Sequence, residues 1–360
     1  MKKLIDKLEK EKRLSFDEWK SIIVEFRNEK DKAIPLFDND SILSYASEKA
    51  RKIRLENFGN KIYVRGLIEF TNYCKNDCYY CGLRKSNKDI ERYRLDENII
   101  LKCCEKGYQL GFKTFVLQGG EDLYFNDDRM ESIIKNIKKN FPDCALTLSV
   151  GEKSFETYEK WKNAGADRYL LRHETADKKH YSTLHPESMS FDNRMECLKN
   201  LKKLGYQTGC GIMVGSPFQT VECIVEDLMF MEKFQPEMVG IGPFLPQHST
   251  PFCDKKGGSL EETLLLLSLV RIMLPKALLP STTALGTVKE GGRELGILCG
   301  ANVVMPNLSP LEFRENYLLY DNKICTGDEA AESLKSLEKN MKNIGYEIVK
   351  ERGDSPFFKK

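Results

Sequence analysis

Three cysteines lie within one eight-residue stretch of the 360-residue chain, at Cys74, Cys78 and Cys81. They follow a largely apolar run from Val64 to Phe70, which places them where a predicted strand opens into a loop. Thiolates are soft ligands, and three of them on one loop can hold three irons of a four-iron cluster. The fourth iron is then free to bind a substrate, because no fourth cysteine follows nearby. The spacing therefore indicates a cluster that does chemistry.

A zinc site, a disulfide and ordinary buried cysteines are the alternatives. Zinc loops usually pair one CxxC with a second such pair or with two histidines, and the four histidines of this chain are scattered. The chain has twelve cysteines and begins with charged residues instead of an apolar leader, which favours a reducing cytoplasm over a disulfide framework. Zinc stays open as the weaker alternative, and most of the remaining cysteines are interpreted as small core residues.

A glycine pair and a carboxylate follow the second predicted strand, at Gly119, Gly120 and Glu121. The missing side chains expose backbone next to an acidic acceptor, which suits a cationic amine. Alone, such a glycine pair is most often a tight turn. Its position, one strand and one helix after the cysteine loop, favours a binding role.

Charged residues also follow the fourth predicted strand, where burial is costly unless they meet partners. The simplest interpretation is an ion pair between Glu174 and either Arg168 or Arg172. The same carboxylate can instead accept two ribose hydroxyls, and an arginine can grip a carboxylate with two nitrogens. Arg194 begins the next predicted helix and, taken alone, is an ordinary surface arginine.

The elements that must position these residues alternate regularly from about residue 62. Short apolar runs predict strands, and longer amphipathic runs predict helices between them. Eight such units imply a parallel sheet closed into a (β/α)8 TIM-type barrel, with its active site at the carboxyl ends of the strands, where the residues above fall. The strand candidates are Val64–Thr71, Thr114–Gly119, Ala145–Val150, Arg168–Arg172, Thr208–Val214, Met238–Pro243, Leu278–Thr283 and Asn302–Pro306.

Two segments flank the predicted barrel. Residues 1–58 are charged and periodic and predict an N-terminal extension of two or three helices, one of which begins after Ser15, with Glu18 completing a capping box. The barrel is assigned to residues 59–307. Residues 308–360 are expected to form a C-terminal helical segment that packs on the barrel. The predicted fold is therefore an α/β barrel with helical additions at both ends.

Charge and hydropathy narrow the class of partner. The 56 basic and 54 acidic residues give a formal net charge of +2, which offers no electrostatic case for nucleic acid. The richest apolar stretch, from Leu264 to Val270, ends at Arg271 and is too short to cross a membrane. We therefore expect a cytoplasmic enzyme that acts on a small molecule.

The three cysteines, with Tyr80 just before the last of them, resemble the motif of the radical S-adenosylmethionine (SAM) enzymes. In that family the open iron of a [4Fe-4S] cluster binds SAM, and one electron from a reduced donor cleaves SAM to a 5'-deoxyadenosyl radical that attacks the substrate. The resemblance implies the same two cofactors here. It also implies that the stretch from Gly119 to Glu121 holds the SAM amino group.

Six stretches carry a narrower resemblance, namely IEFTN at 68–72, YCGLR at 80–84, VLQGGED at 116–122, DRYLLRHETA at 167–176, MVGIGPF at 238–244 and TTALGT at 282–287. They resemble the HydE family, radical SAM maturases of [FeFe]-hydrogenase, over about residues 62–325. The resemblance implies that the three cysteines hold the cluster. The residues implied to contact SAM are Tyr80, Gly119, Gly120, Glu121, Glu174 and Arg194. Those implied to line or adjoin the substrate cavity are Arg168, Arg172, Met238, Thr282 and Thr283.

The same resemblance implies a substrate and partners. The family acts on an iron-carbonyl-cyanide complex that carries cysteine and is delivered by the maturase HydG, in a maturation system that also contains HydF. Some members carry a second cluster on three cysteines near the C-terminus. Cys325 matches the first of these positions, but Ser333 and Ser336 stand at the other two. We therefore expect no second cluster and interpret Cys325 as a lone thiol.

Other functions stay open. A radical SAM mutase such as methylornithine synthase shares the barrel and the early motifs and is the nearest alternative. Biotin synthase would need further cysteines for a sulfur-donating cluster. A non-catalytic iron-sulfur scaffold that carries a precursor between maturation partners would need neither Glu121 nor Glu174, and a zinc-stabilised structural protein is the most distant alternative.

Overall fold

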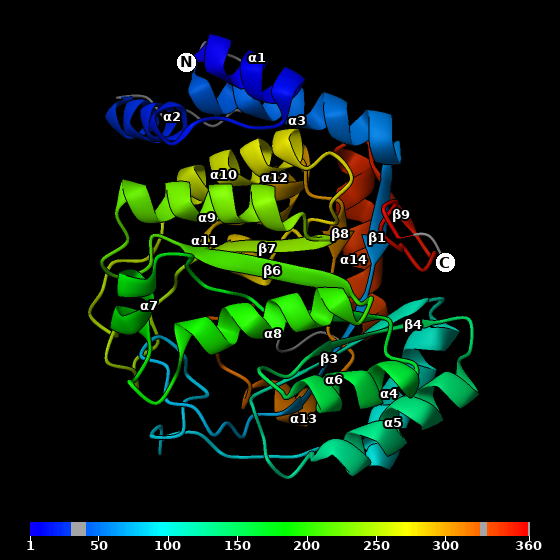
Figure 1. The fold of residues 1–360 in the computed structure, drawn as a ribbon. Coiled ribbons are helices and arrows are strands. Elements are labelled where there is room, and N and C mark those ends of the chain that lie inside the picture. Colours follow the sequence, from blue (N-terminus) through cyan, green and yellow to red (C-terminus); the bar gives the residue numbers. More distant parts are fainter. Residues whose placement is uncertain (30–40, 325–329, 359–360) are drawn as a thin grey trace.

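The computed structural model describes residues 1–29, 41–324 and 330–358, and a parallel sheet lies at its centre (Figure 1). Six strands are neighbours in the order β2-β3-β4-β5-β6-β7, and every neighbouring pair is parallel. The strands are β2 (Gly66–Thr71), β3 (Thr114–Gly119), β4 (Ala145–Ser149), β5 (Arg168–Leu170), β6 (Gln207–Val214) and β7 (Met238–Pro243). Sequential parallel strands joined by helices are the arrangement predicted from the sequence.

Single bridges, instead of regular ladders, complete the ring of strands. These parallel bridges join Met238 to Leu278, Pro280 to Val303, and Asn307 to Leu67. The ring therefore passes from β7 through two short extended segments back to β2. Eight extended segments surround one interior, so the predicted barrel is confirmed, although its last two positions are far less regular than the first six.

The seventh strand candidate, Leu278–Thr283, is the clearest correction. This described stretch holds only the bridges at Leu278 and Pro280 and forms no regular strand. Proline has no N–H for a ladder hydrogen bond, which limits pairing at Pro280. Thr283 is instead the first residue of helix α11 (Thr283–Val288).

The first and eighth candidates are also shorter than predicted. The first is divided into β1 (Lys61–Val64) and β2, and the eighth is reduced to β8 (Val303–Val304). β1 pairs with β8 on one side and with β9 (Glu347–Val349) on the other. The start of the first strand therefore also anchors the end of the chain.

Helices surround the ring, and side-chain caps fix where they start. Each helix that begins between Phe16 and Leu260 follows a Ser, Thr, Asp or Asn whose side chain accepts a hydrogen bond from the backbone three residues later. The predicted capping box of Ser15 and Glu18 is confirmed. The ring helices are α4 (Glu97–Gln109), α5 (Asp127–Asn140), α6 (Phe155–Asn163), α7 (Lys178–Leu184), α8 (Phe191–Lys203), α9 (Val221–Phe234), α10 (Leu260–Met273), α11, α12 (Gly292–Leu298) and α13 (Leu311–Arg314).

Three N-terminal helices cover one side of the barrel (Figure 1). They are α1 (Lys2–Glu11), α2 (Phe16–Asn28) and α3 (Ile42–Phe58), and they pack against α9 and α10. Because α10 lies between the barrel and these helices, its apolar residues from Leu264 to Leu267 are all fully buried. In the described part of the chain, no helix is both long and apolar enough to cross a membrane.

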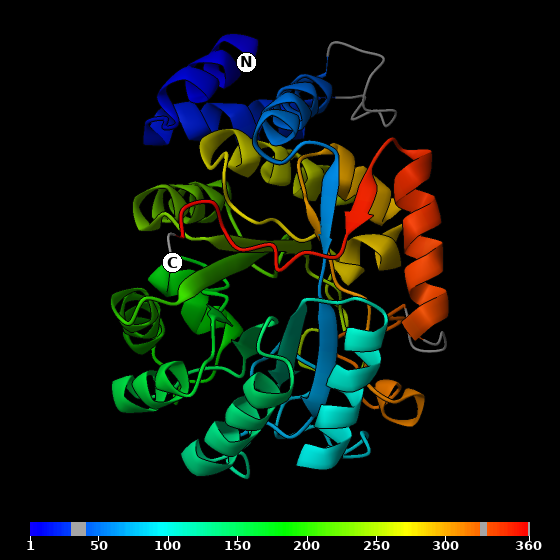
Figure 2. The ribbon, with the colours of Figure 1, turned by 90° about the vertical axis from the view of Figure 1, so that its right-hand side faces the viewer.

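The C-terminal segment closes the barrel at the amino-terminal ends of the strands. After α14 (Ala330–Asn343) and β9, the chain crosses the first residues of β3 and β6, as the red segment in Figure 2 shows. There Thr114 Oγ1 donates to the carbonyl of Arg352, and the Ser355 N–H donates to Gln207 Oε1, each at 2.8 Å. The opposite end, where the strands finish, is where the cysteine loop lies.

Candidate active site

The cysteine loop begins directly after β2, at the carboxyl ends of the strands, as predicted. Cys74, Cys78 and Cys81 are half-buried as whole residues, but their thiols are enclosed enough that burial raises the pKa of each, that of Cys81 to about 12. The neighbouring thiols raise the pKa of Cys78 further. The three sulfurs therefore interact electrostatically, and a bound cation would relieve their repulsion and displace their protons.

The chemistry of the loop fits a four-iron cluster. Its three thiols lie near enough that, beyond the effect of burial, Cys81 and Cys74 raise the pKa of Cys78, so they can act together on one bound group. A four-iron cluster binds each cysteine at a different iron, and three thiolates leave its fourth iron open. Thiolates are also the soft ligands that iron-sulfur clusters take.

A single arginine that was not predicted to take part holds the loop in shape. The Arg92 guanidinium donates hydrogen bonds to four backbone carbonyls, those of Asn72, Leu83, Arg84 and Asn87. Asp77, between the first two cysteines, accepts from Arg84 Nε at 2.8 Å and from the Ser86 N–H at 3.0 Å. These bonds fix the path of the chain on both sides of the cysteines.

Residues after the barrel also reach the loop. The segment 308–324 contacts it through a hydrogen bond of 3.0 Å from the Gly82 N–H to the carbonyl of Leu319. The segment is anchored by a buried ion pair in which Lys323 Nζ lies 2.6 Å from Glu69 Oε1. It therefore forms part of the wall beside the cysteines.

Glu121 lies buried immediately after β3, beside the cysteine loop. Its N–H donates to Cys74 Sγ at 3.4 Å, and its Oε2 lies 3.2 Å from Lys75 Nζ. A Cβ at Gly120 would collide with the loop backbone, and one at Gly151 would collide with the Glu121 side chain. Both glycines are therefore required for this close approach. The pairing with Lys75 shows that a primary ammonium fits against this carboxylate.

Four charged groups form a connected row at the ends of β4 and β5. Arg194, buried on α8, pairs through Nε with Glu152, and its Nη1 donates to the carbonyl of Arg172 at 2.7 Å. Arg172 Nη2 lies 3.2 Å from Glu174 Oε2, so the ion pair predicted as the simplest interpretation is present. Glu152 was not predicted as a site residue. Its position directly after a strand was the signal that could have found it.

Tyr80 is oriented by His185, a residue that no sequence motif distinguishes because the four histidines are scattered along the chain. The Tyr80 hydroxyl lies 3.2 Å from His185 Nε2, and His185 Nδ1 lies 3.0 Å from the carbonyl of Tyr181. A carbonyl only accepts, so Nδ1 carries the proton and Nε2 accepts from the Tyr80 hydroxyl. The His185 ring also stacks on Tyr181, with ring centroids 4.0 Å apart.

We expect His185 to make the protein less stable in mild acid. Burial lowers the pKa of His185 from 6.5 to about 3, so below its ordinary pKa the unfolded chain takes up a proton that the folded protein does not. The free energy of unfolding then falls by about 1.4 kcal/mol for each pH unit below that value. His185→Gln does not titrate, and its Tm should fall less than that of the wild type between about pH 7.5 and 5.5. An equal change of Tm with pH in the wild type and in His185→Gln would contradict a neutral, buried His185.

The structure brings three of the predicted substrate residues, Arg172, Thr282 and Thr283, to the later part of β7 or its neighbours. Met238 is the first residue of β7, where its Sδ lies 3.1 Å from Arg65 Nη1. Two glycines on β7 lie beside Arg172 and Thr282. A Cβ added at Gly240 would lie 4.0 Å from Arg172 Cδ, and one added at Gly242 would lie 3.1 Å from Thr282 Oγ1. The missing side chains therefore leave space next to Arg172 and Thr282. The Thr282 hydroxyl is buried and has no hydrogen-bond partner among the described residues. A ligand that accepts or donates a hydrogen bond would satisfy it.

Arg168 does not join these residues. It is fully buried at the start of β5, and its Nη2 donates to the Arg352 carbonyl and to Asp354 Oδ1, each at 2.7 Å. The resemblance placed it near the substrate cavity because it shares a motif with Arg172. The two arginines are four positions apart along the chain, so Arg168 lies toward the amino-terminal end of the barrel and holds the C-terminal segment.

Removing the partner of Arg168 should affect stability rather than chemistry. Burial opposes ionisation of Asp354, but Arg352 and Arg168 hold its pKa well below its usual range. We expect Asp354→Ala to lower the free energy of unfolding by about 3 kcal/mol, because it leaves a buried guanidinium without a counterion. The activity per folded molecule should be unchanged. Lost activity at unchanged stability would instead place Arg168 in the active site.

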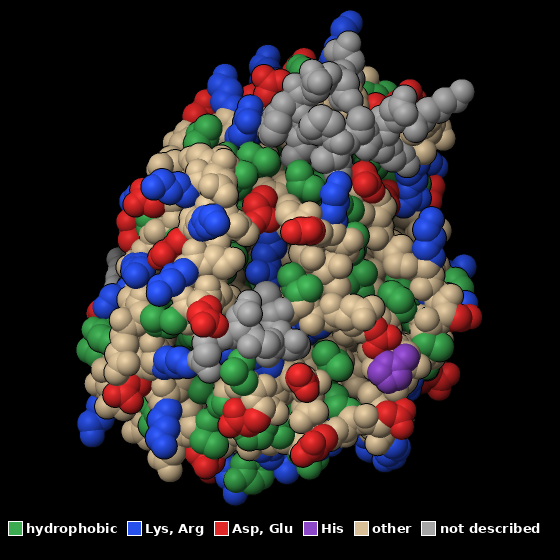
Figure 3. All heavy atoms as spheres, turned by 180° about the vertical axis from the view of Figure 1, so that it is seen from behind, with side chains coloured by type: hydrophobic (Ala, Val, Ile, Leu, Met, Phe, Trp, Pro, Cys, Tyr) green, Lys and Arg blue, Asp and Glu red, His purple; other side chains and the backbone are tan. Residues whose placement is uncertain are grey.

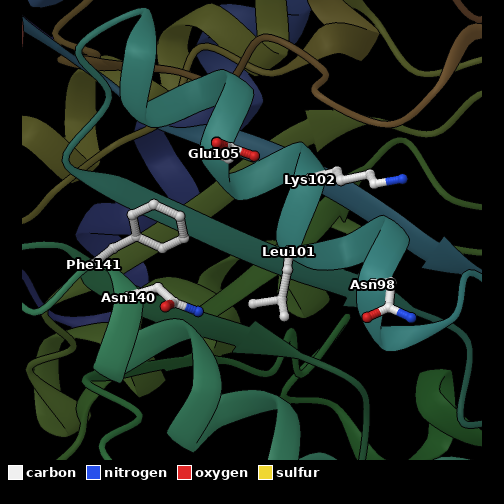
Figure 4. A pocket seen from close by; sticks show the side chains of 6 residues that line it. All are labelled: Asn98, Leu101, Lys102, Glu105, Asn140 and Phe141. Carbon is white, nitrogen blue, oxygen red and sulfur yellow. The ribbon is translucent and has the colours of Figure 1, made fainter.

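Two surface features lie outside this site. On the face in Figure 3, basic and acidic side chains are interspersed, as the small net charge leads one to expect. A hollow of about 580 Å³ lies between α4 and the end of α5 (Figure 4), and it is lined by Asn98, Leu101, Lys102, Glu105, Asn140 and Phe141. Because it lies on the helices and not at the carboxyl ends of the strands, it is not part of the candidate site.

Comparison with known proteins gives the family. The model of the Radical SAM superfamily matches residues 68–231, which contain the cysteine loop, Glu121, Glu174 and Arg194. The chain is 45% identical over 307 residues to the [FeFe] hydrogenase maturase subunit HydE of Thermotoga maritima, covering 85% of this chain and 86% of the relative. The chain belongs to the HydE family of radical SAM enzymes. Membership of this family implies a [4Fe-4S] cluster and SAM as cofactors.

More distant relatives agree on the fold. The 3-methylornithine synthase of Methanosarcina barkeri is 30% identical, over 92% of this chain and 97% of its own length. The crystal structure of methylornithine synthase matches with a TM-score of 0.82 at 27% identity, over 96% of this chain and 97% of that chain. The crystal structure of HydG, at 21% identity and a TM-score of 0.73, shares the fold alone. A radical SAM TIM-type barrel is thus confirmed for this member of the HydE family.

Proposed function

We propose that this enzyme is a HydE-type maturase. It would use a [4Fe-4S] cluster to cleave SAM and would process an iron-carbonyl-cyanide complex that carries cysteine, during assembly of the active site of [FeFe]-hydrogenase, the H-cluster. The observation that carries this proposal is the 45% identity to HydE over 85% of the chain. HydG as the source of the complex, HydF and a reduced electron donor are the proposed partners.

Each charged group of the cofactors would bind a residue of opposite charge. When bound, the cluster and SAM together supply a 5'-deoxyadenosyl radical. Cys74, Cys78 and Cys81 would hold three irons. Glu121, which already pairs with an ammonium group, would hold the SAM amino group. Arg194, a buried guanidinium beside a single carboxylate, would hold the SAM carboxylate.

Other residues would place the rest of SAM. Glu174 would accept the two ribose hydroxyls, since its carboxylate is buried and lies beside Arg172. Tyr80, whose hydroxyl is held by His185, would contact SAM next to the last cysteine. Gly119 and Gly120 would let the backbone approach the cofactor closely.

The barrel interior would bind the organometallic complex. Arg172 would complement its anionic ligands, and Thr282, whose buried hydroxyl lacks a partner among the described residues, would donate to one of them. Thr283 would contribute to the same wall, and Met238 would lie deeper in the barrel, at the start of β7. The segments 308–324 and 350–355 cover the barrel at its two ends, which would shield a reactive radical and a labile complex from water.

A single cluster is proposed. Ser333 and Ser336 replace the cysteines that a second cluster would need, and Cys325 lies outside the described residues. Chemical analysis of the reconstituted protein should therefore give about four irons per chain. A clear excess of cluster-bound iron over four would contradict this proposal.

A radical SAM mutase of the methylornithine synthase type is the second candidate, because a relative of that name aligns over 97% of its length. A maturation assay separates the two. The purified protein is added to unmatured [FeFe]-hydrogenase with HydG, HydF, SAM and reductant, and hydrogen evolution is measured. The maturase proposal expects hydrogenase activity that depends on this protein and on SAM. An active preparation that cleaves SAM and consumes lysine, yet restores no hydrogenase activity, would favour the mutase.

A further inference from the structure

Glu174 is held in a backbone conformation that needs outside support. Its φ is 65°, in the left-handed region that residues with a branched or long side chain rarely adopt. Its N–H donates to the carbonyl of Gly211 on β6 at 3.0 Å, which pins the residue to the barrel wall. Strained residues of this kind persist where the surrounding structure fixes them, and they concentrate at functional sites. The groups that fix Glu174 therefore matter for where its carboxylate points.

That support comes from α9, a helix of the outer ring. Asp227, fully buried on this helix, accepts through Oδ1 from the Ala176 N–H at 2.5 Å, and the same oxygen lies 3.4 Å from His173 Nε2. The Gly211 N–H donates to His173 Nδ1 at 3.3 Å, so the neutral ring carries its proton on Nε2, the nitrogen that faces Asp227. One carboxyl oxygen therefore contacts the chain on both sides of Glu174.

The arrangement requires an acceptor oxygen and no charge. Burial lowers the pKa of His173 to about 3 and raises the pKa of Asp227 well above its usual range, which favours a neutral imidazole beside a neutral carboxyl group. The carbonyl oxygen of a neutral carboxyl group still accepts from the Ala176 N–H. Phe230, one turn further along α9, packs on the His173 ring with centroids 4.6 Å apart and fixes its plane.

We propose that Asp227 and His173 are positioning residues that hold Glu174 in the orientation that binds the ribose of SAM. Asp227 contacts the Ala176 N–H from the side of the outer helix, His173 accepts from the Gly211 N–H on β6, and both act through Glu174. The inference rests on the proposed function of Glu174 as a SAM ligand. It adds Asp227, on α9, and His173, in the loop between β5 and α7, to the residues that support the cofactor site. An outer helix then contributes to cofactor affinity without contributing a ligand.

The test measures the Kd of SAM for the cluster-loaded protein by anaerobic titration calorimetry. Asp227→Ala should weaken binding about tenfold, a change of roughly 1.4 kcal/mol. Asp227→Asn keeps an acceptor oxygen of the same shape and should stay within about threefold of the wild type. Glu174→Ala should weaken binding at least as much as Asp227→Ala. In the Glu174→Ala background, Asp227→Ala should add nothing, because both act on one contact.

Val225→Ala is the matched control, since Val225 is fully buried on the same helix. It should lower the Tm and leave the Kd unchanged, which separates positioning from general loss of packing. Iron per chain is measured for every variant. If Asp227→Ala does not fold, His173→Phe replaces it with the same expected non-additivity, since it removes both ring nitrogens.

Two results would overturn the inference, namely a wild-type Kd in Asp227→Ala alongside a weakened Glu174→Ala, or full additivity of the two variants. A wild-type Kd in Glu174→Ala would instead remove the SAM contact itself, and with it the basis of the inference. The single and double variants therefore distinguish two outcomes. In one, Asp227 does not position Glu174; in the other, Glu174 does not bind SAM.

Discussion

Cys78→Ser is expected to abolish SAM cleavage while the barrel still folds. Cys78 lies in the middle of the cysteine loop, and a serine hydroxyl does not replace a soft thiolate at iron. The loss should exceed the roughly 10–100-fold effect of removing a hydrogen-bonding partner of a metal ligand. The fold should persist because the four hydrogen bonds of Arg92 and the segment 308–324 hold the loop independently of the Cys78 thiol.

The measurements for this variant are iron content, 5'-deoxyadenosine formation and the far-ultraviolet circular dichroism spectrum. Cys253→Ser is a suitable control, because Cys253 is an exposed cysteine outside the loop, and it should keep full iron content and activity. Undiminished iron and full SAM cleavage in Cys78→Ser would refute the cluster assignment. Loss of the spectrum of a folded barrel would show instead that the thiol is structural.

Arg172→Ala is expected to reduce conversion of the organometallic substrate much more than cluster or SAM binding. Arg172 lies against the glycine-lined part of β7, facing the side of the barrel that also carries Thr282. Arg172 is half-buried here, and a bound substrate would enclose it. Removing one partner of a charge pair that is buried in a complex costs about 2–5 kcal/mol of binding free energy. That corresponds to at least about a thirtyfold loss in kcat/KM for the substrate.

The measurements must distinguish the effect of losing Arg172 from an indirect effect on Glu174, because Arg172 Nη2 lies 3.2 Å from Glu174 Oε2. Iron content and the Kd of SAM are measured beside substrate conversion, and Arg172→Lys is included because it keeps the charge but not the planar pair of donors. We expect Arg172→Lys to recover only part of the conversion. Equal losses of SAM affinity and substrate conversion in Arg172→Ala would count against a role in substrate binding.

The ring of strands and the cysteine loop follow from local patterns, which explains why the sequence predicted them. β3 and β7 have the predicted bounds, since each is a short apolar run between turn residues. The cysteine motif needs only three residues at fixed spacing on one loop. Helix starts were equally local, as the capping box of Ser15 and Glu18 shows.

The sequence did not reveal residues whose role depends on contacts far along the chain. Asp227 meets Ala176 across 51 positions, and His185 meets Tyr80 across 105 positions. Neither side chain lies in a motif that distinguishes it from an ordinary polar residue. Arg168 shows the opposite case, in which a motif suggested a contact that the fold does not make. It shares a sequence motif with Arg172, but the length of β5 separates the two side chains, and Arg168 pairs with Asp354 instead.

We propose that this radical SAM enzyme acts on the organometallic complex made by HydG. The most direct test measures 5'-deoxyadenosine formed by the anaerobically reconstituted and reduced protein, with the HydG product, lysine or dethiobiotin as the substrate. We predict SAM cleavage coupled to consumption of the HydG product, with lysine and dethiobiotin left intact. Cleavage of SAM with the HydG product left unchanged would contradict the maturase function, and consumption of lysine would identify a mutase instead.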